Sequence, residues 1–384
     1  MATTETFPEL PLFDLQLDKQ DLYAVAQTLR SGWLTMGPRT EAFEDAFAAH
    51  LGARHAIAVS SCTAALHLAY LAAGVGPGDE VIVPSFTFVA TAAAVVYCGA
   101  TPVFAEIASR ARPSLDPDDV ARRITPRTKA VCVVHYAGYA AQADRLRELC
   151  DAHGIALIED VAHAPSATLA GRALGTWGLA GAFSFFSNKV LSVGEGGLLC
   201  TDSEEVAEFA RSRRSHAMTS GTWERHRRQT DTYDVVGLGY NYRIDEPRAA
   251  LLLSRLERLQ DDVARRRELT LRYRALLADV EGLIVPFEDA DVPDSSCYVM
   301  PIMLERDGDH QAQVSSRLRE QGIQTSIFYP SIHRFSAYRE RFPDVSLPIT
   351  ELASRTELTL PLYPHMTHAD QDRVVAALAQ ALAP

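Results

Sequence analysis

Residues 55–85, HAIAVSSCTAALHLAYLAAGVGPGDEVIVPS, decide the fold. The stretch predicts a short buried strand at 55–60, a helix at 63–74 and a second buried strand at 80–85. Short apolar strands joined by helices are typical of a parallel sheet that helices cover on both faces. The sequence therefore predicts an α/β protein.

The same alternation continues on the C-terminal side of this stretch. Further strands are expected at 101–107, 129–138, 155–160, 182–186 and 196–202, with helices at 89–99, 118–124 and 144–154. Residues 246–280 predict one long amphipathic helix that leads to further strand and helix patterns. We expect two domains: a large domain with a mostly parallel sheet over residues 1–250, including an N-terminal segment, and a smaller C-terminal α/β domain over residues 251–384.

Composition narrows the class of protein. The chain has 384 residues, 47% hydrophobic and 22% charged, as in an ordinary globular enzyme. Its net charge of −12 argues against binding to nucleic acid or to a membrane surface. No apolar run approaches the roughly 18 residues of a membrane span, and the start MATTETFPEL lacks the regions of a signal peptide. The six cysteines have no metal-binding spacing. A cytoplasmic protein without a metal site is expected.

Three positions near strand ends carry candidate chemistry. Asp160 closes the strand IALIED, Ser60, Ser61 and Thr63 lie between a strand and a helix N-terminus, and Lys189 follows the strand AFSFF. Each has an ordinary structural explanation: a carboxylate or hydroxyl that caps a helix, or a lysine in solvent. Together they match the needs of pyridoxal 5′-phosphate (PLP). A lysine forms the Schiff base, a carboxylate pairs with the pyridine nitrogen, and helix-terminal amides hold the phosphate.

Burial near residue 189 would favour the neutral amine that this chemistry requires. The glycines at 194, 196 and 197, in the stretch SNKVLSVGEGG, allow the backbone to turn tightly beside the lysine.

The segments IEDVAHA, FSFFSNKVLSVGEGG and LGYNYRIDEPRAALLLSRL resemble the signature blocks of the DegT/DnrJ/StrS sugar aminotransferases. SGWLTMGPRTEAFEDAF, DEVIVPSFTFVATAAAVVYCGATPVF and GIQTSIFYPSIHRFSAY match the remaining blocks, so the resemblance covers the chain from about residue 15. It implies PLP-dependent transferase fold type I.

The resemblance also implies roles for individual residues. Lys189 would carry PLP and Asp160 would pair with its pyridine nitrogen. His163 would lie near the phenolic oxygen, and Phe88 would stack on the pyridine ring. Some relatives have histidine in place of the lysine and catalyse dehydration, and Lys189 places this chain outside that branch.

Four more positions are implied to bind the cofactor phosphate. Ser184 and Thr63 would contact it within one chain, and Asn241 in GYNYR would reach it from the neighbouring subunit of a homodimer with shared active sites. Cys62 stands where the family often has glycine, so the phosphate turn must accommodate a β-carbon there.

The candidates for substrate binding come from two segments. Residues 211–228 contain six arginines and one glutamate, a local reversal of the overall negative charge that suits a diphosphate. Arg227 and Arg228 represent this cluster, although a solvated helix and loop would show the same pattern. Tyr329 and His333 in IFYPSIH are candidates to line a sugar pocket, and a packed tyrosine with a surface histidine is the alternative.

The predicted function is transfer of an amino group from glutamate to a nucleotide-linked keto sugar, in an amino-sugar or secondary-metabolite pathway. The preferred acceptor is a dTDP-4-keto-6-deoxyhexose aminated at C4, and the alternatives are a 3-keto sugar or the cyclitol scyllo-inosose with glutamine as donor. A nicotinamide oxidoreductase is disfavoured because the glycines of GVGPGDE follow a helix and precede a strand. A non-catalytic regulator is disfavoured because Lys189 and Asp160 are both present.

Overall fold

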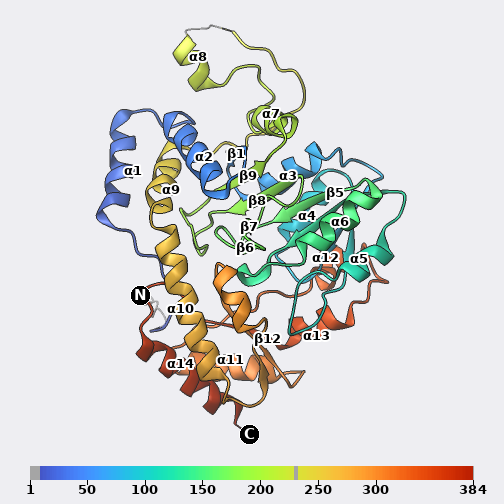
Figure 1. Ribbon diagram of the computed structural model, residues 1–384, viewed down its shortest axis with the longest axis vertical. Helices are drawn as coiled ribbons and strands as arrows, with labels where there is room; N and C mark the ends of the chain where they lie inside the picture. Colours follow the sequence, from blue (N-terminus) through green and yellow to red (C-terminus); the bar gives the residue numbers. More distant parts are fainter. Residues whose placement is uncertain (1–8, 229–231, 384) are drawn as a thin grey trace, which may run out of the picture.

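The structure, a computed structural model, describes residues 9–228 and 232–383 (Figure 1). Within these residues the largest sheet has seven strands in the order β1-β9-β8-β5-β4-β2-β3. The strands are β1 (His55–Val59), β2 (Glu80–Pro84), β3 (Thr101–Ala105), β4 (Thr128–Val134), β5 (Ala156–Asp160), β8 (Ala180–Ser184) and β9 (Gly197–Thr201).

The direction of these strands confirms the predicted mostly parallel sheet. β8, β5, β4, β2 and β3 pair in parallel, while β9 runs antiparallel to both of its neighbours, β1 and β8. β1 and β8 therefore point the same way on either side of β9. All strands of this sheet except β9 end at one edge, where ligands bind in open α/β sheets.

Helices cover both faces of the sheet, as the apolar strands require. α3 (Cys62–Ala72), α4 (Ala90–Tyr97) and α7 (Glu204–Arg213) share one apolar cluster with Val81 and Val83 of β2. α5 (Pro117–Arg123) and α6 (Ala143–His153) share another with Ile82. Alternate side chains of β2 thus point into opposite layers.

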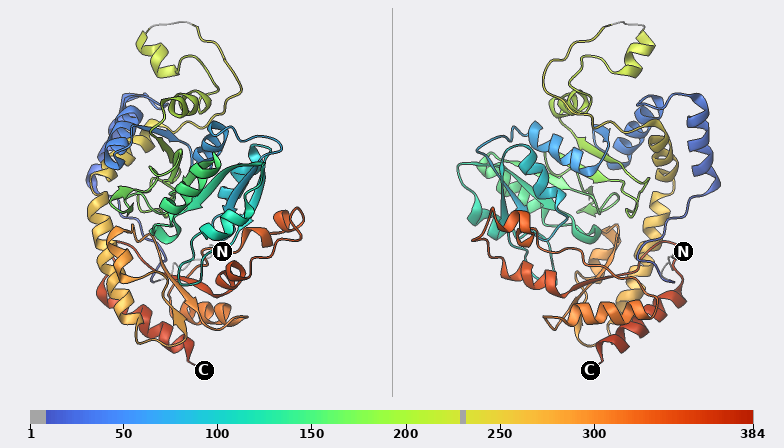
Figure 2. Two further views of the ribbon diagram at one scale, coloured as in Figure 1. Left: turned by 45° about the vertical axis from the view of Figure 1, so that its right-hand side comes forward. Right: turned by 180° about the vertical axis from the view of Figure 1, so that it is seen from behind.

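The C-terminal part of the chain forms a second, antiparallel sheet that lies beyond the end of the first (Figures 1 and 2). It consists of β10 (Leu283–Ile284), β11 (Met300–Leu304) and β12 (Glu357–Leu360), with α11 (His310–Glu320), α13 (Pro348–Thr356) and α14 (His368–Leu382) around it. The expected division at residue 250 falls inside α9 (Glu246–Leu256) and stays a prediction.

The single helix predicted over 246–280 is wrong. α9 ends at Leu256, and α10 (Leu259–Leu277) begins after a turn. In that turn the Arg258 amide donates a hydrogen bond to the Arg255 carbonyl oxygen. The Arg258 guanidinium forms ion pairs with Asp18 and Asp21, at 2.7 Å each. These contacts with the start of α1 (Lys19–Ser31) fix the turn, and an amphipathic pattern alone does not reveal them.

The remaining elements lie outside the two sheets. α1 and α2 (Pro38–Leu51) pack against α9. α8 (Thr222–Arg228) projects beyond the sheets (Figures 1 and 2), and its Trp223 ring packs against Trp33, with ring centroids 5.0 Å apart. Two short strands, β6 (Thr168–Leu169) and β7 (Arg172–Ala173), form a hairpin, and α12 (Ser336–Arg339) is a single turn.

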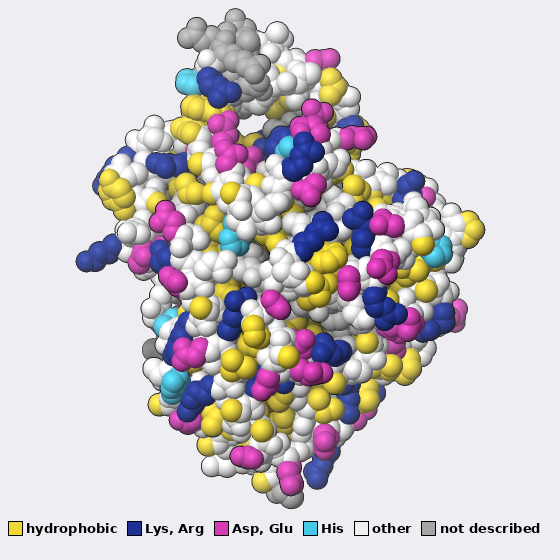
Figure 3. Space-filling model, in the orientation of Figure 1, with side chains coloured by type: hydrophobic (Ala, Val, Ile, Leu, Met, Phe, Trp, Pro, Cys, Tyr) yellow, Lys and Arg dark blue, Asp and Glu magenta, His cyan; other side chains and the backbone are white. Residues whose placement is uncertain are grey.

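The surface carries charges of both signs. Acidic and basic side chains are interspersed on the face shown in Figure 3. Among the described residues, no helix has the length and apolar character to cross a membrane.

Candidate active site

The candidate site lies at the carboxyl edge of the large sheet. Asp160 is the last residue of β5 and pairs in register with Ala182 of β8. Lys189 follows the end of β8 and lies in a turn, in which its backbone amide donates a 2.9 Å hydrogen bond to the Phe186 carbonyl oxygen. Neighbouring parallel strands thus bring to one edge two residues that are far apart in the sequence.

Asp160 is buried and held by hydrogen bonds. Its Oδ2 accepts a bond from the Thr91 hydroxyl at 2.8 Å, and its Oδ1 accepts one from the Ala162 amide at 3.1 Å. Burial raises the pKa of Asp160, while these two bonds and the charge of Lys189 oppose the shift. The site therefore contains a desolvated carboxylate held in a fixed orientation.

The amine of Lys189 lies over an aromatic ring. Its Nζ is 4.5 Å from the ring centroid of Tyr298 and 3.4 Å from the Tyr298 hydroxyl. Burial lowers the pKa of Lys189 to about 8, against the attraction of Asp160. A larger fraction of this amine than of an ordinary lysine is therefore neutral, and hence nucleophilic, near neutral pH.

His163 and Tyr329 form a hydrogen-bonded pair beside this amine. His163 Nδ1 accepts a bond from the Ala137 amide at 3.3 Å, which assigns the ring proton to Nε2. Nε2 then donates to the Tyr329 hydroxyl at 2.9 Å. Burial and the charge of Lys189 hold the pKa of His163 well below its usual range, so the ring is neutral. Tyr329 keeps its own proton to donate to another group.

The turn between β1 and α3 has the form of an anion site. Ser61 caps α3 by accepting a bond from the Ala64 amide at 3.2 Å, and Thr63 lies in the first turn. A β-carbon on Gly197 would lie 2.2 Å from the Ser61 carbonyl carbon, so only glycine lets the start of β9 approach this turn. Cys62 is buried, and its Sγ lies 3.9 Å from Asp160 Oδ1. The turn accommodates the extra β-carbon by directing it toward Asp160.

Two further predicted residues lie at the same edge. Ser184 ends β8, and its Oγ accepts a long bond of 3.4 Å from the Phe186 amide. Phe88 follows β2 and is 58% exposed, with its ring centroid 6.1 Å from that of Tyr329. The exposed ring is available to stack on a ligand.

The structure does not bring the other candidates to Lys189. His333 is buried and uses both ring nitrogens, with Ser85 Oγ at 2.7 Å and Glu351 Oε1 at 3.2 Å, so it packs within the protein. Asn241 is exposed and forms a backbone bridge with Ser215. Arg227 lies on α8, and the Arg228 side chain is outside the described residues.

Sequence reasoning missed two residues of this site. Tyr298 lies under the lysine amine and stacks on His163, with ring centroids 4.4 Å apart. Thr91 orients Asp160. Tyr298 precedes β11 and Thr91 lies in α4, both within ordinary apolar patterns, and no motif marks either one.

The residues present fit PLP. One edge of the sheet carries a desolvated amine, a carboxylate in a fixed orientation and the N-terminus of α3. Gly197 lets β9 approach that helix N-terminus closely. The amine would bind the aldehyde, the carboxylate would accept a hydrogen bond from the protonated pyridine nitrogen, and the helix amides would donate to the phosphate. The sheet and this set of residues define the class: a PLP-dependent enzyme of fold type I.

The comparisons with known proteins agree. The model of the DegT/DnrJ/EryC1/StrS aminotransferase family matches residues 15–379, and the chain belongs to this family. It is a PLP-dependent sugar aminotransferase.

Three similar proteins cover nearly the whole chain. The spore coat polysaccharide biosynthesis protein SpsC of Bacillus subtilis (strain 168) is 38% identical over 367 residues, 94% of each chain. The crystal structure of the aminotransferase TlmJ from Streptoalloteichus hindustanus has a TM-score of 0.89 at 36% identity, covering 97% of this chain and 98% of that chain. The PMP-form of Spr1654 from Streptococcus pneumoniae has a TM-score of 0.87 at 25% identity, covering 97% of each chain.

Proposed function

We propose that this enzyme transfers the amino group of glutamate to C4 of a dTDP-linked 4-keto-6-deoxyhexose. The observation that carries the proposal is the half-buried Lys189, whose amine has its pKa lowered to about 8 by desolvation against the attraction of Asp160. Such an amine can both attack a carbonyl carbon and relay protons at neutral pH.

The roles of the site residues follow from their contacts. PLP supplies an electron-withdrawing ring that stabilises negative charge at the reacting carbon. Lys189 Nζ holds the cofactor, then takes a proton from one carbon and returns it to another. Asp160 stays ionised to hold a proton on the pyridine nitrogen, with Thr91 fixing its orientation. The pKa of His163 lies well below its usual range, so this residue supplies a neutral hydrogen-bond donor beside the ring.

The remaining cofactor contacts belong to the same proposal. Thr63 and Ser184 bind the phosphate with the amides of the α3 N-terminus, including that of Cys62. Phe88 covers the exposed face of the ring.

An arginine-lined cavity supports the nucleotide-linked acceptor. Arg211, Arg227 and Arg243 line a cavity of about 640 Å³, together with Trp223. Three glutamates, Glu41, Glu44 and Glu208, also line it. A diphosphate needs donors such as these arginines, and an indole can stack on a base. Substitution of Arg227 and Arg228 by alanine should raise KM for the sugar nucleotide more than it lowers kcat, and the effect should shrink at high salt.

The active unit that we propose is a homodimer with shared sites. Leu22, Tyr23 and Leu29 of α1 are 59%, 63% and 54% exposed, and Leu238, near Asn241, is 87% exposed. Large apolar side chains in this number favour a partner surface. A mixture of Asn241→Ala and Lys189→Ala subunits should then regain activity, because one hybrid site is intact. No regain after demonstrated subunit exchange would contradict shared sites.

All six cysteines are buried and unpaired. Reduced cysteines support our proposal that the enzyme works in the cytoplasm.

A competition assay tests the acceptor. The enzyme is offered the 4-keto sugar nucleotide and its 3-keto isomer with glutamate, and scyllo-inosose with glutamine. We expect product from the 4-keto sugar. Product only from the 3-keto isomer would correct the carbon, and product only from the cyclitol would overturn the nucleotide-linked acceptor and the glutamate donor.

A further inference from the structure

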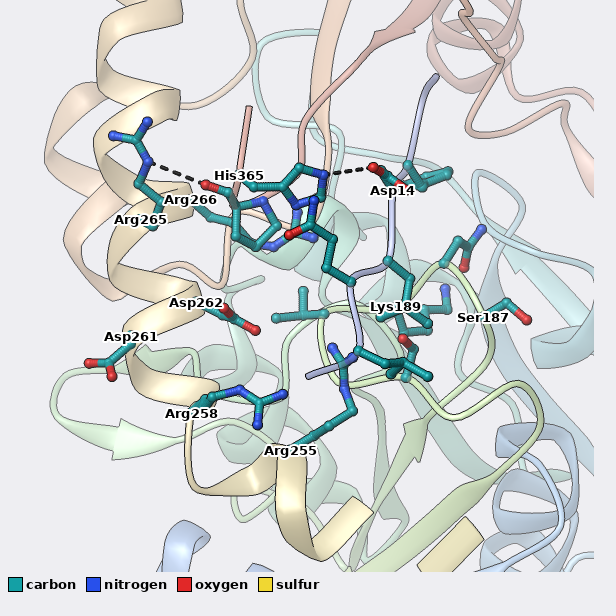
Figure 4. Close-up of a pocket in the computed structure, with 18 of the residues that line it drawn as sticks. Asp14, Ser187, Lys189, Arg255, Arg258, Asp261, Asp262, Arg265, Arg266 and His365 are labelled. Carbon is teal, nitrogen blue, oxygen red and sulfur yellow. Dashed lines mark hydrogen bonds and ion pairs between the residues drawn. The ribbon is translucent and has the colours of Figure 1, made fainter. Parts of the chain in front are cut away.

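A second cavity lies on the side of Lys189 that faces α10 (Figure 4). Its volume is about 610 Å³, which is in the range of small-molecule sites. Its walls are the N-terminal segment 13–18, the active-site turn around Lys189, and the junction of α9 and α10. The cavity thus joins the active-site turn to a part of the protein that the proposed cofactor contacts do not use.

Buried polar atoms without partners gather in this cavity. Arg255 is 6% exposed, and its Nε and Nη1 have no hydrogen-bond partner among the described residues. The same holds for Nε of Arg266, Oγ of Ser192 and Oδ1 of Asn188, all of which line the cavity. Figure 4 shows Arg255 extending from the end of α9 into the space in front of Lys189.

Such groups are costly unless something binds them. A buried guanidinium without an acceptor forfeits its hydration, and burial lowers the pKa of Arg255. A folded protein retains such a group most readily where a ligand supplies the missing acceptor. Water can accept a hydrogen bond there but brings no compensating charge.

The acidic groups of the cavity indicate the kind of ligand. Asp14 is held by a hydrogen bond with His365 at 2.7 Å, and Asp18 pairs with the Arg258 guanidinium at 2.7 Å, so both carboxylates already have partners. Asp262 forms no ion pair within the described part of the chain, and it faces Arg255 and Arg266, whose charges it stabilises. The cavity thus combines unpartnered guanidinium donors for a carboxylate with Asp261 and Asp262, carboxylates outside any ion pair of the described residues that can accept from an ammonium. This combination suits a zwitterion better than a simple anion.

We propose that this cavity receives the amino donor, an α-amino acid with a second carboxylate, and that Arg255 binds the side-chain carboxylate of that donor. The proposal rests on the proposed function, since it takes Lys189 to be the amine that exchanges with the donor. Arg266 adds a second donor group, while Asp262 and Asn188 Oδ1 accept from the ammonium. Arg255 is then a specificity-determining residue, and it distinguishes the dicarboxylate glutamate from neutral-chain amino acids.

The first test separates donor binding from the rest of the reaction. Arg255→Gln should raise KM for glutamate about 10- to 100-fold, the range for a lost charge-assisted hydrogen bond. The absorbance of bound PLP and KM for the sugar nucleotide should stay unchanged. The matched control is Arg272→Gln on α10, because Arg272 pairs with Asp372 at 2.6 Å outside the cavity. An unchanged KM for glutamate in Arg255→Gln would overturn the proposal.

A second measurement distinguishes a ligand-binding role from a structural one. If Arg255 is kept for a ligand, Arg255→Gln and Arg255→Met should unfold at the same temperature as the wild type or a higher one in the absence of donor. A lower unfolding temperature in both variants, with donor affinity intact, would assign Arg255 to packing and overturn the proposal.

Direct binding completes the test without any turnover. Calorimetry of the cofactor-free enzyme with glutarate should show binding that Arg255→Gln loses and Arg272→Gln keeps. Inorganic phosphate at the same concentration should bind more weakly. Equal binding of phosphate would make the cavity a general anion site and overturn the donor assignment. These binding measurements do not use the sugar acceptor. A different acceptor from the one proposed would therefore leave them unchanged, and each proposal can be contradicted without the other.

Discussion

The hydroxyl of Thr91 donates a 2.8 Å hydrogen bond to Oδ2 of Asp160. Thr91 lies in α4 and Asp160 at the end of β5, so the contact spans the layer between helix and sheet. It opposes the burial that raises the pKa of Asp160. The ionised state of this carboxylate therefore depends on a helix residue that carries no motif.

Thr91→Val should shift the pKa of Asp160 further upward, because the charged form loses a hydrogen-bond donor. The carboxylate must be ionised to hold a proton on the pyridine nitrogen. The acidic limb of the activity profile should therefore lie at a higher pH in Thr91→Val than in the wild type. Turnover at neutral pH should drop about 10-fold, the worth of one charge-assisted bond. The pH profile of kcat measures both effects. Thr270→Val, which removes a buried hydroxyl elsewhere, is the control, and an equal shift in both variants would contradict this role.

Tyr329→Phe should lower turnover while changing stability little. The phenylalanine keeps the ring packing beside Phe328, with centroids 4.8 Å apart, but loses the hydroxyl that His163 Nε2 contacts. Steady-state rates and thermal unfolding measure the two effects. Tyr363→Phe, at a buried tyrosine that packs against His365 with ring centroids 4.7 Å apart, tests the loss of a hydroxyl alone. A stability loss without a rate loss would assign Tyr329 to packing.

Gly197→Ala should impair cofactor binding and folding together. The new β-carbon would lie 2.2 Å from the Ser61 backbone, so the phosphate turn must move, at a cost of about 1–3 kcal/mol for such overpacking. Gly76→Ala is the matched control, because a β-carbon there meets nothing within 4 Å. Urea unfolding and titration with PLP compare the two variants. Equal behaviour would show that the turn tolerates the change.

The lowered pKa of Lys189 has a consequence for stability. Between the folded value of about 8 and the ordinary value of 10.5, the unfolded chain binds a proton that the folded chain has released. The free energy of unfolding of the cofactor-free enzyme should therefore rise with pH across this window, relative to Lys189→Met. Below pH 8 the methionine variant should be the more stable of the two. Urea unfolding at several pH values measures this, and parallel curves for the two proteins would contradict the lowered pKa.

The sequence predicts the parts of the site that lie at strand ends. Asp160 and the turn after β1 could be located because parallel strands that end at one edge bring their following residues together. Tyr298 could not be located from the sequence, because its role depends on how the C-terminal sheet packs against the active-site turn. The burial of His333 could not be predicted for the same reason, since its partners Ser85 and Glu351 come from two other segments, and its role in a sugar pocket stays a prediction. The turn at Arg258 depends likewise on acidic residues of the distant α1.

The central claim is that Lys189 carries the cofactor, and the chain makes a direct test possible. It has three lysines, Lys19, Lys129 and Lys189, and the first two are exposed. Borohydride reduction of the PLP-loaded enzyme, followed by peptide mass spectrometry, locates the modified lysine. We predict stoichiometric modification of Lys189, none of Lys19 or Lys129, and no modification in Lys189→Ala. Modification of another lysine, or an unchanged adduct in Lys189→Ala, would contradict the account.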